Sequence, residues 1–241
     1  MKRLKTFVGL AALCAALGTT AGTTTGLAVH APNVRLRAGT STNWSGYAAA
    51  GTPGTFTSVA ASWTQPTVTC TSQTTFSAYW VGLDGDTTST VEQLGTEADC
   101  VGGVPRYSSW YEMYPHRSYA ASIRVVPGDT YQASVVYLGS GNFRLTLRDT
   151  TAGTPAFTTV QKLANAKLAS AEAIVEAPSG GGVLPLANFG NANFSGVTAN
   201  GATMTSPPAA QITMVNSSGG IKAQPSGLAG GNFSVTWHSA S

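Results

Sequence analysis

Hydrophobic and polar positions follow the two-residue period of β-strands, in short runs, through most of the chain. The clearest run is NFRLTLRDT, residues 142–150, in which Phe143, Leu145 and Leu147 alternate with polar residues. Alternation of this kind directs the apolar side chains to one face of a sheet. Similar runs recur at roughly 8- to 12-residue spacing, separated by Pro-Gly-Asp and Gly-Ser-Gly turn sequences. About a dozen such strands predict an all-β sandwich of two antiparallel sheets.

One segment has a different spacing. Residues 160–173, VQKLANAKLASAEA, place apolar residues three and four apart, which fits either a helix or a loop beside a strand. The glycine-rich segment SGGGVLPLANFGN, residues 179–191, is interpreted as a surface loop. The sequence contains no internal repeat and no interdomain linker. We therefore expect one domain over residues 43–241, with enough apolar residues for a substantial core.

The first residues have the pattern of a secretory signal peptide. A basic head, MKRLK, precedes a short apolar run at 7–17 and then small residues. The run is too short to span a bilayer. We expect a signal peptide within residues 1–31, cleaved near residue 21 or 31, and a secreted protein without membrane association after its removal. Residues 32–42 are expected to be a flexible leader or the remnant of a propeptide.

Removing the signal peptide changes the charge and the cysteine count. The formal net charge of +3 comes from 13 basic and 10 acidic residues, and three of the basic ones lie in the head. The remaining chain is neutral and gives no indication of a nucleic-acid partner. Cys70 and Cys100 then remain, and an oxidising compartment favours a disulfide between them.

Several kinds of catalytic chemistry lack the residues they need. After processing, His116 and His238 remain in unrelated contexts and no cysteine cluster remains, so neither a metal site nor a cofactor is expected. No serine lies in the Gly-x-Ser-x-Gly pattern of a nucleophile elbow. Carboxylates and amides are the groups that remain.

Half of the ten acidic residues lie in one short stretch, with an uncharged Gln93 among them. These five are Asp84, Asp86, Glu92, Glu97 and Asp99. Glu112 lies in the aromatic run SSWYEMYP, and Glu172 and Glu176 share one face of the strand AEAIVEAP. A carboxyl group on an apolar face has a raised pKa, so it can act as a base and then an acid in mildly acidic water. The same residues are also compatible with a solvated sheet face.

Seven segments resemble, in order, those of the glutamic peptidases of the G1 (eqolisin) family, over nearly all of the chain from 43 to about 195. They are NWSGY (43–47), ASWTQP (61–66), YWVGLDG (79–85), EQLGTE (92–97), WYEMYP (110–115), PGD (127–129) and AEAIVEAP (171–178). The resemblance implies a β-sandwich of two curved antiparallel sheets with about seven strands each. It also implies a secreted, acid-active endopeptidase that acts on polypeptides without a cofactor, and we expect a monomer.

The resemblance assigns roles to particular residues. Glu176 is expected to be the general base and then the general acid for water, and Gln93 to stabilise the oxyanion. The polar and aromatic residues expected to support this dyad are Trp44, Trp80, Asp84, Glu97 and Glu112. The chain departs from the family pattern in three segments, which bears on the shape of the substrate cleft more than on the dyad. They are Leu94, where a small hydroxyl residue is common, Ala173, where tryptophan is common, and Ala177–Pro178, where many fungal members have Asp-Phe.

Two other functions fit the same composition. A carbohydrate-binding or glycan-cleaving sandwich would stack sugars on tryptophans, for which Trp44, Trp63, Trp80 and Trp110 are available, and would use paired carboxylates. Such an enzyme has no need of a particular glutamine, so Gln93 discriminates between the two activities. The second alternative is a secreted binding module without catalysis on the same scaffold.

Overall fold

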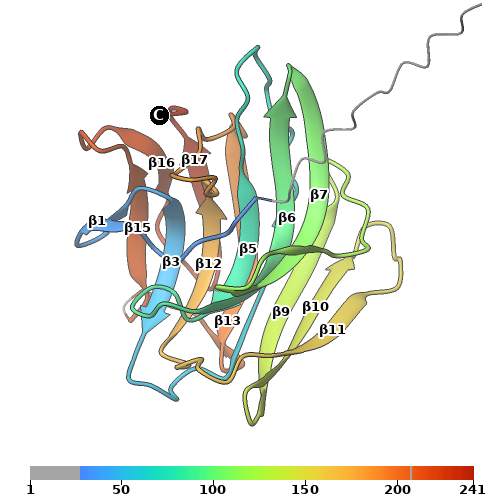
Figure 1. The fold of residues 1–241 in the computed structure, drawn as a ribbon, viewed down its shortest axis with the longest axis vertical. Helices are drawn as coiled ribbons and strands as arrows, with labels where there is room; N and C mark the ends of the chain where they lie inside the picture. Colours follow the sequence, from blue (N-terminus) through green and yellow to red (C-terminus); the bar gives the residue numbers. More distant parts are fainter. Residues whose placement is uncertain (1–27, 207) are drawn as a thin grey trace, which may run out of the picture.

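The computed structural model describes residues 28–206 and 208–241, so most of the predicted signal peptide lies outside the described residues. The described chain contains strands and no helix (Figure 1). The strands in the first half are β1 (Arg35–Arg37), β2 (Thr40–Ser41), β3 (Trp44–Ala50), β4 (Ser58–Thr64), β5 (Ala78–Leu83), β6 (Val91–Val101), β7 (Val104–Tyr114) and β8 (Tyr119–Ala120). Those in the second half are β9 (Thr130–Gly139), β10 (Asn142–Asp149), β11 (Phe157–Lys162), β12 (Ser170–Glu176), β13 (Asn191–Ala199), β14 (Ala202–Thr203), β15 (Ala210–Val215), β16 (Ile221–Pro225) and β17 (Phe233–Trp237).

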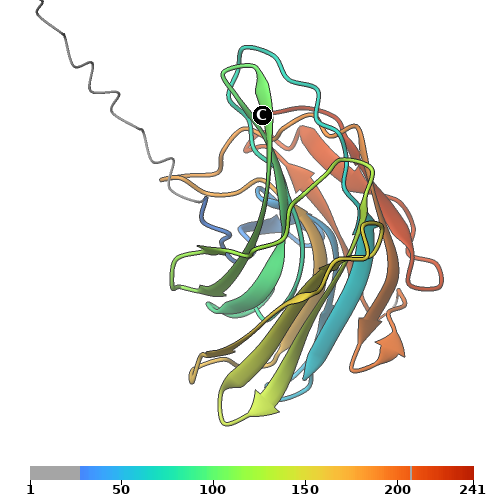
Figure 2. The ribbon, with the colours of Figure 1, turned by 90° about the vertical axis from the view of Figure 1, so that its right-hand side faces the viewer.

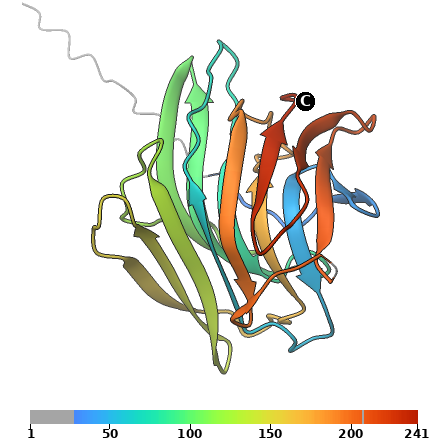
Figure 3. The ribbon, with the colours of Figure 1, turned by 180° about the vertical axis from the view of Figure 1, so that it is seen from behind.

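The strands form two curved layers, which confirms the predicted sandwich (Figure 2). The front sheet has the antiparallel order β15–β3–β12–β5–β6–β7–β8. The back sheet, which faces the viewer in Figure 3, has the antiparallel order β11–β10–β9–β4–β13–β17–β16. Strand β15 belongs to both sheets, because it pairs with β3 at one end and with β16 at the other.

The main core lies between the two sheets and follows the alternation of the strands. In β10, Phe143, Leu145 and Leu147 are fully buried, as the sequence predicted, and they pack with residues such as Val81 and Leu94 from the front sheet. The segment 160–173 contains no helix: its first residues end β11, and its last residues begin β12. Its apolar residues are therefore spaced by strands and a turn.

A second, smaller apolar cluster lies on the other face of the front sheet, away from the back sheet. It is formed by Trp44, Ala48, Ala78, Trp80, Val91, Trp110, Ile174 and Ile212. The residues at the start of the described chain cover this face. Residues 28–34 cross in front of β12 and β5 as the blue segment in Figure 1. A two-strand hairpin, β1–β2, follows them, and β2 runs parallel to β15.

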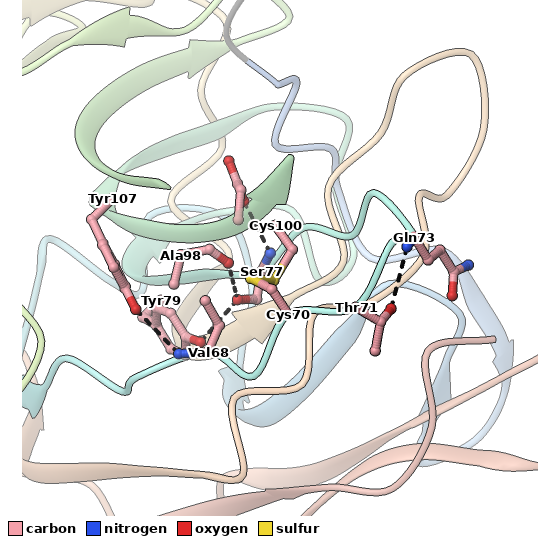
Figure 4. Close-up of a disulfide and its surroundings, with 10 residues drawn as sticks. Val68, Cys70, Thr71, Gln73, Ser77, Tyr79, Ala98, Cys100 and Tyr107 are labelled. Atoms are coloured by element: carbon pink, nitrogen blue, oxygen red, sulfur yellow. Dashed lines mark hydrogen bonds between the residues drawn. A yellow bond between two sulfur atoms is a disulfide. The ribbon is translucent and has the colours of Figure 1, made fainter. Parts of the chain in front are cut away.

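The predicted disulfide between Cys70 and Cys100 is present, with a Cα–Cα distance of 5.4 Å (Figure 4). It joins the loop that precedes β5 to the last residues of β6. Next to it, the Ser77 hydroxyl donates to the Ala98 carbonyl and the Tyr107 hydroxyl accepts from the Val68 amide. The disulfide therefore fixes one end of the strand that carries Gln93 and Glu97. No helix within residues 28–206 and 208–241 is long and apolar enough to cross a membrane.

Candidate active site

The floor of the candidate site is a row of residues across three neighbouring strands of the front sheet. Trp80 on β5 pairs with Gly95 on β6, which pairs with Trp110 on β7. A β-carbon at Gly95 would lie 2.1 Å from the backbone oxygen of Tyr79 and 2.6 Å from the β-carbon of Trp80, so strand β5 leaves no space for a side chain there. Glycine is therefore required at this position between Gln93 and Glu97.

Glu176, at the end of β12, is completely buried and has partners on both carboxylate oxygens. Its Oε2 accepts a hydrogen bond of 2.9 Å from the indole nitrogen of Trp80. Its Oε1 accepts a hydrogen bond of 3.0 Å from the backbone amide of Ala31. Burial raises the pKa of Glu176, whereas its contacts with His30, Trp80 and Ala31 oppose that rise.

Gln93, on β6, binds the peptide unit whose amide, that of Ala31, is bound by Glu176. Its Nε2 donates a hydrogen bond of 2.6 Å to the carbonyl oxygen of His30. The side chains of Gln93 and Glu176 therefore contact the carbonyl and the amide of one peptide bond, His30–Ala31. The dyad residues expected from the sequence are brought together around a backbone group of the chain itself.

Two further carboxylates contact His30. Glu112, which pairs with Gln93 in the β6–β7 register, accepts a hydrogen bond of 2.9 Å from the His30 amide. Glu97 lies 3.3 Å from the imidazole Nε2 and also accepts a hydrogen bond from Ser108. Burial raises the pKa of Glu112 to about 7, although the charge of His30 and its amide oppose the rise.

His30 is fully buried and lies flat against Trp110, with ring centroids 3.4 Å apart and an angle of 7° between the planes. Its Nδ1 lies 3.4 Å from Glu176, so the ring is held between two carboxylates. Burial lowers the pKa of this imidazole, but the contacts with Glu176 and Glu97 outweigh burial and raise it to about 10. The imidazole is therefore a cation in neutral and acidic water.

The sequence prediction missed His30 because it assigned this residue to the signal peptide. One signal was available in the sequence: His30 is a polar residue within the otherwise apolar stretch LAVHAP. Its contacts are with strands 63 or more residues further along the chain. No local period in the sequence indicates such contacts.

The supporting residues expected from the sequence divide into two groups. Trp44, Trp80, Glu97 and Glu112 are at the site, and Trp44 donates a hydrogen bond of 3.0 Å from its indole nitrogen to the Ala31 carbonyl. The Trp44 and Trp80 rings meet edge to face with centroids 4.9 Å apart. These residues bind the same short segment of backbone.

Asp84 is the exception, because it lies at the end of β5 away from Glu176 and binds a different segment of backbone. It follows the end of β5 in a left-handed conformation (φ 67°), whereas Glu176 pairs with Ala78 at the opposite end of that strand. Both Asp84 oxygens accept hydrogen bonds from backbone amides, those of Lys167, Leu168 and Ala169. Its observed contacts order the loop that leads into β12.

Two other buried carboxyls lie near Asp84 and have no hydrogen-bond partner within the described residues, Glu92 and Glu172. With Asp84 they form a group that we call the distal acids. Burial raises the pKa of Glu92 to about 9, and the neighbouring charge of Asp84 adds to the rise. Burial likewise raises the pKa of Glu172 well above its ordinary value. Both carboxyls are therefore neutral in acid. Among residues 28–206 and 208–241, no group of three or more His, Cys, Asp and Glu side chains is arranged to hold a metal ion.

Comparison with known proteins identifies the family. The model of the peptidase A4 family matches residues 42–237, and the chain belongs to that family. Aspergillopepsin-2 of Aspergillus niger is 29% identical over 164 residues, which are 66% of this chain and 58% of that protein. The chain thus spans under two thirds of this relative's length.

Solved structures of glutamic peptidases share the fold. Scytalido-glutamic peptidase, solved with a transition-state analogue inhibitor, has a TM-score of 0.70 at 24% identity, covering 82% of this chain and 98% of its own. SCP-B, a member of the eqolisin family solved with the tripeptide Ala-Ile-His, has a TM-score of 0.66 at 23% identity, with the same coverage. These structural matches show the same fold, and the family model over residues 42–237 confirms the predicted resemblance to a family of peptidases.

Proposed function

We propose that this protein is a secreted, acid-active endopeptidase that acts as a monomer and hydrolyses peptide bonds with Gln93 and Glu176. One observation carries the proposal: Gln93 donates to the carbonyl oxygen, and Glu176 accepts from the amide, of a single peptide bond. These are the two atoms whose charge changes when a peptide bond is hydrolysed. The membership of the chain in a peptidase family supports the same conclusion.

The proposed reaction begins with Glu176 taking a proton from a water molecule as the water attacks the carbonyl carbon. Negative charge then develops on the carbonyl oxygen, where the Gln93 amide donates a hydrogen bond. A glutamine amide can stabilise this oxyanion without a charge of its own. Glu176 finally gives the proton to the leaving nitrogen, which lies 3.0 Å from its Oε1 in the contact with Ala31.

Acid activity follows from the burial of the carboxyls. Burial raises the pKa of Glu176, so this group ionises in a range where it can both take and return a proton. Burial also raises the pKa of Glu112 to about 7, so Glu112 is neutral at lower pH and adds no negative charge beside the dyad. We expect activity to fall as pH rises toward neutrality, because ionised Glu112 then repels the developing oxyanion.

The surroundings of the dyad are suited to a peptide backbone. SCP-B was solved with the tripeptide Ala-Ile-His, and residues 28–30 of this chain are Ala-Val-His. The site contacts this backbone through amide, indole and carboxylate groups. The glycan alternative requires open tryptophan faces, but Trp63 lies in the core and donates to Thr96. A polypeptide is therefore the substrate that the geometry favours.

The test uses denatured casein at pH 3 to 4, with wild-type protein and the Glu176→Gln variant. The matched control is Glu172→Gln, because Glu172 is also buried, lies on the same strand face and is four residues away. We expect cleavage by the wild type and the control, and a loss of about 10²- to 10⁴-fold in Glu176→Gln. Cleavage that persists in Glu176→Gln would remove Glu176 as the base. A folded wild type without activity would favour the binding module.

A further inference from the structure

Residues 28–34 pass through the candidate site in the manner of a bound peptide. Upstream of the dyad, Val29 forms an isolated antiparallel bridge with Ser179, with backbone hydrogen bonds of 3.2 and 2.8 Å. The Ala28 carbonyl accepts a hydrogen bond of 2.7 Å from the Ser118 hydroxyl, in the loop between β7 and β8. Loops from two different parts of the chain therefore hold this half of the segment.

Downstream of the dyad, Asn43 binds three backbone positions. Its Nδ2 donates to the carbonyl oxygens of Ala31 and Pro32, at 3.3 and 3.0 Å. Its Oδ1 accepts a hydrogen bond of 2.8 Å from the amide of Val34. A single buried side chain thus fixes the path of the backbone from residue 31 to residue 34.

At the centre, every backbone polar group of His30 and Ala31 contacts a side chain of the site. The His30 amide donates to Glu112 and its carbonyl accepts from Gln93. The Ala31 amide donates to Glu176 and its carbonyl accepts from Trp44. A leader that merely packed on an apolar face would bury side chains without this match. The match is to a peptide unit, and it centres on one bond.

We propose that the His30–Ala31 bond is a self-processing site, which the protein hydrolyses in its own chain with Gln93 and Glu176 and selects through the imidazole of His30. The inference rests on the proposed peptidase function. In the step, a water oxygen bonds to the His30 carbonyl carbon and the bond to the Ala31 nitrogen breaks. One water proton passes through Glu176 to that nitrogen. The products are a segment that ends in the His30 carboxylate and a protein that begins at Ala31.

The selection of histidine follows from the chemistry around its ring. Trp110 offers a flat face at stacking distance, and the carboxylates of Glu97 and Glu176 flank the two ring nitrogens. Glu112, the third carboxyl nearby, binds the backbone amide of the same residue. A planar cation satisfies all of these groups, whereas an aliphatic side chain would leave the buried Oε1 of Glu97 without its cationic neighbour. The position before the cleaved bond is therefore suited to histidine or arginine.

The geometry also indicates that cleavage occurs within one molecule. The chain runs without interruption from Ala31 through residue 34 into β1, β2 and β3, all of which lie on the same domain. A bond already held by its own active site reacts at a rate independent of protein concentration. Cleavage by a second molecule would give a rate that rises with concentration.

The first experiment maps the N-terminus of the full chain by intact mass. Wild type, Glu176→Gln and Glu172→Gln are produced in a secreting host, collected at neutral pH and shifted to pH 4. We expect wild type and Glu172→Gln to begin at Ala31 after the shift, at a rate that does not change over a tenfold range of concentration. We expect Glu176→Gln to retain His30. If Glu176→Gln also begins at Ala31, a host protease makes the cut, and the proposal is overturned.

The second experiment separates this inference from the proposed function and does not require folding of a variant. The synthetic peptide AVHAPNV, which copies residues 28–34, is incubated with processed wild type beside casein. We expect cleavage between His and Ala, and at least tenfold slower cleavage of AVLAPNV. Casein cleavage with AVHAPNV left intact would overturn the processing site while the peptidase function stands. Failure to cleave either substrate would overturn both.

Discussion

The two groups of buried acids on the front sheet differ in what surrounds them. The dyad acids, Glu97, Glu112 and Glu176, each contact His30 or Ala31. Among the distal acids, Asp84 binds three backbone amides, whereas Glu92 and Glu172 have no hydrogen-bond partner within the described chain. The groups share strands β6 and β12 of the front sheet, and all of their members are buried. Burial alone therefore does not distinguish a catalytic carboxyl from a structural one.

The difference lies in the partners, which also decide the charge. Unpartnered carboxyls such as Glu92 are neutral in acid because burial penalises the charged form. Burial raises the pKa of Glu112 and of Glu176 as well, but hydrogen bonds from backbone amides and the neighbouring His30 ring oppose that rise. Only carboxyls with such donors are arranged to exchange protons with a substrate.

The largest expected effect comes from two adjacent residues of β6. Gln93 contacts the carbonyl oxygen at the site, whereas Glu92 points to the other face of the strand. We expect Gln93→Ala to lower kcat on casein by about 10²- to 10³-fold, since one oxyanion donor is lost. Glu92→Gln should leave kcat nearly unchanged, because this side chain lies on the other face of β6 from the peptide bond bound by Gln93. Equal losses in both variants would show that this strand acts only through folding.

The next effect concerns the structural role of Asp84. Asp84→Ala removes an acceptor from three backbone amides, two of which are buried contacts. A buried donor left without its acceptor costs about 1–3 kcal/mol, so we expect a loss of roughly 3 kcal/mol or more in the free energy of unfolding. Urea unfolding at pH 4 would measure it. If Asp84→Ala keeps the stability of wild type but loses activity, Asp84 supports catalysis and its role is not merely structural.

The pH dependence of stability should follow the distal acids. The pKa of Glu92 is raised to about 9 in the folded protein, so the folded state holds a proton that the unfolded state releases above about pH 4.5. Stability is therefore complete below pH 4.5 and is lost as pH rises from there toward 9. Burial raises the pKa of Glu172 as well, which acts in the same direction.

Melting temperatures between pH 4 and pH 8 check this sign, with Glu92→Gln as the comparison. We expect the melting temperature of wild type to fall by several degrees over this range and that of Glu92→Gln to fall less. His30 affects stability only at higher pH. The pKa of its imidazole is about 10 in the folded protein and about 6.5 in the unfolded chain, so its contribution to stability is complete below pH 6.5 and is lost as pH rises from 6.5 toward 10. A melting temperature that rises steadily to pH 8 would contradict the assignment.

The smallest expected effect is on selectivity. Glu97→Gln keeps the size of the side chain beside the imidazole and removes its charge. We expect the preference for AVHAPNV over AVLAPNV to fall about tenfold, which corresponds to about 1.4 kcal/mol. Cleavage of casein should change less than this preference does. An unchanged preference would leave stacking on Trp110 as the sole basis of selection.

Much of the fold could be predicted from alternation in the sequence. The apolar face of β10 and the carboxyls of β7 and β12 lie where the strand period placed them. The segments around Gln93 and Glu176 were identified by family resemblance, because no local pattern relates two residues so far apart in the chain. The contacts of Asp84 with the loop before β12 could not be predicted, because they join residues more than 80 positions apart through a left-handed turn after β5. His30 was missed because a signal-peptide pattern describes export and carries no information about contacts made after folding.

The covalent continuity of residues 31–34 with β1 limits what cleavage alone can accomplish. After a cut, the new α-amino group stays beside Glu176 while Asn43, Trp44 and the Arg35–Asp86 ion pair of 2.7 Å hold the segment in place. A tethered product has an effective concentration of about millimolar, so an outside polypeptide competes against it at every encounter. Turnover of foreign substrates is then governed by how readily this short arm detaches.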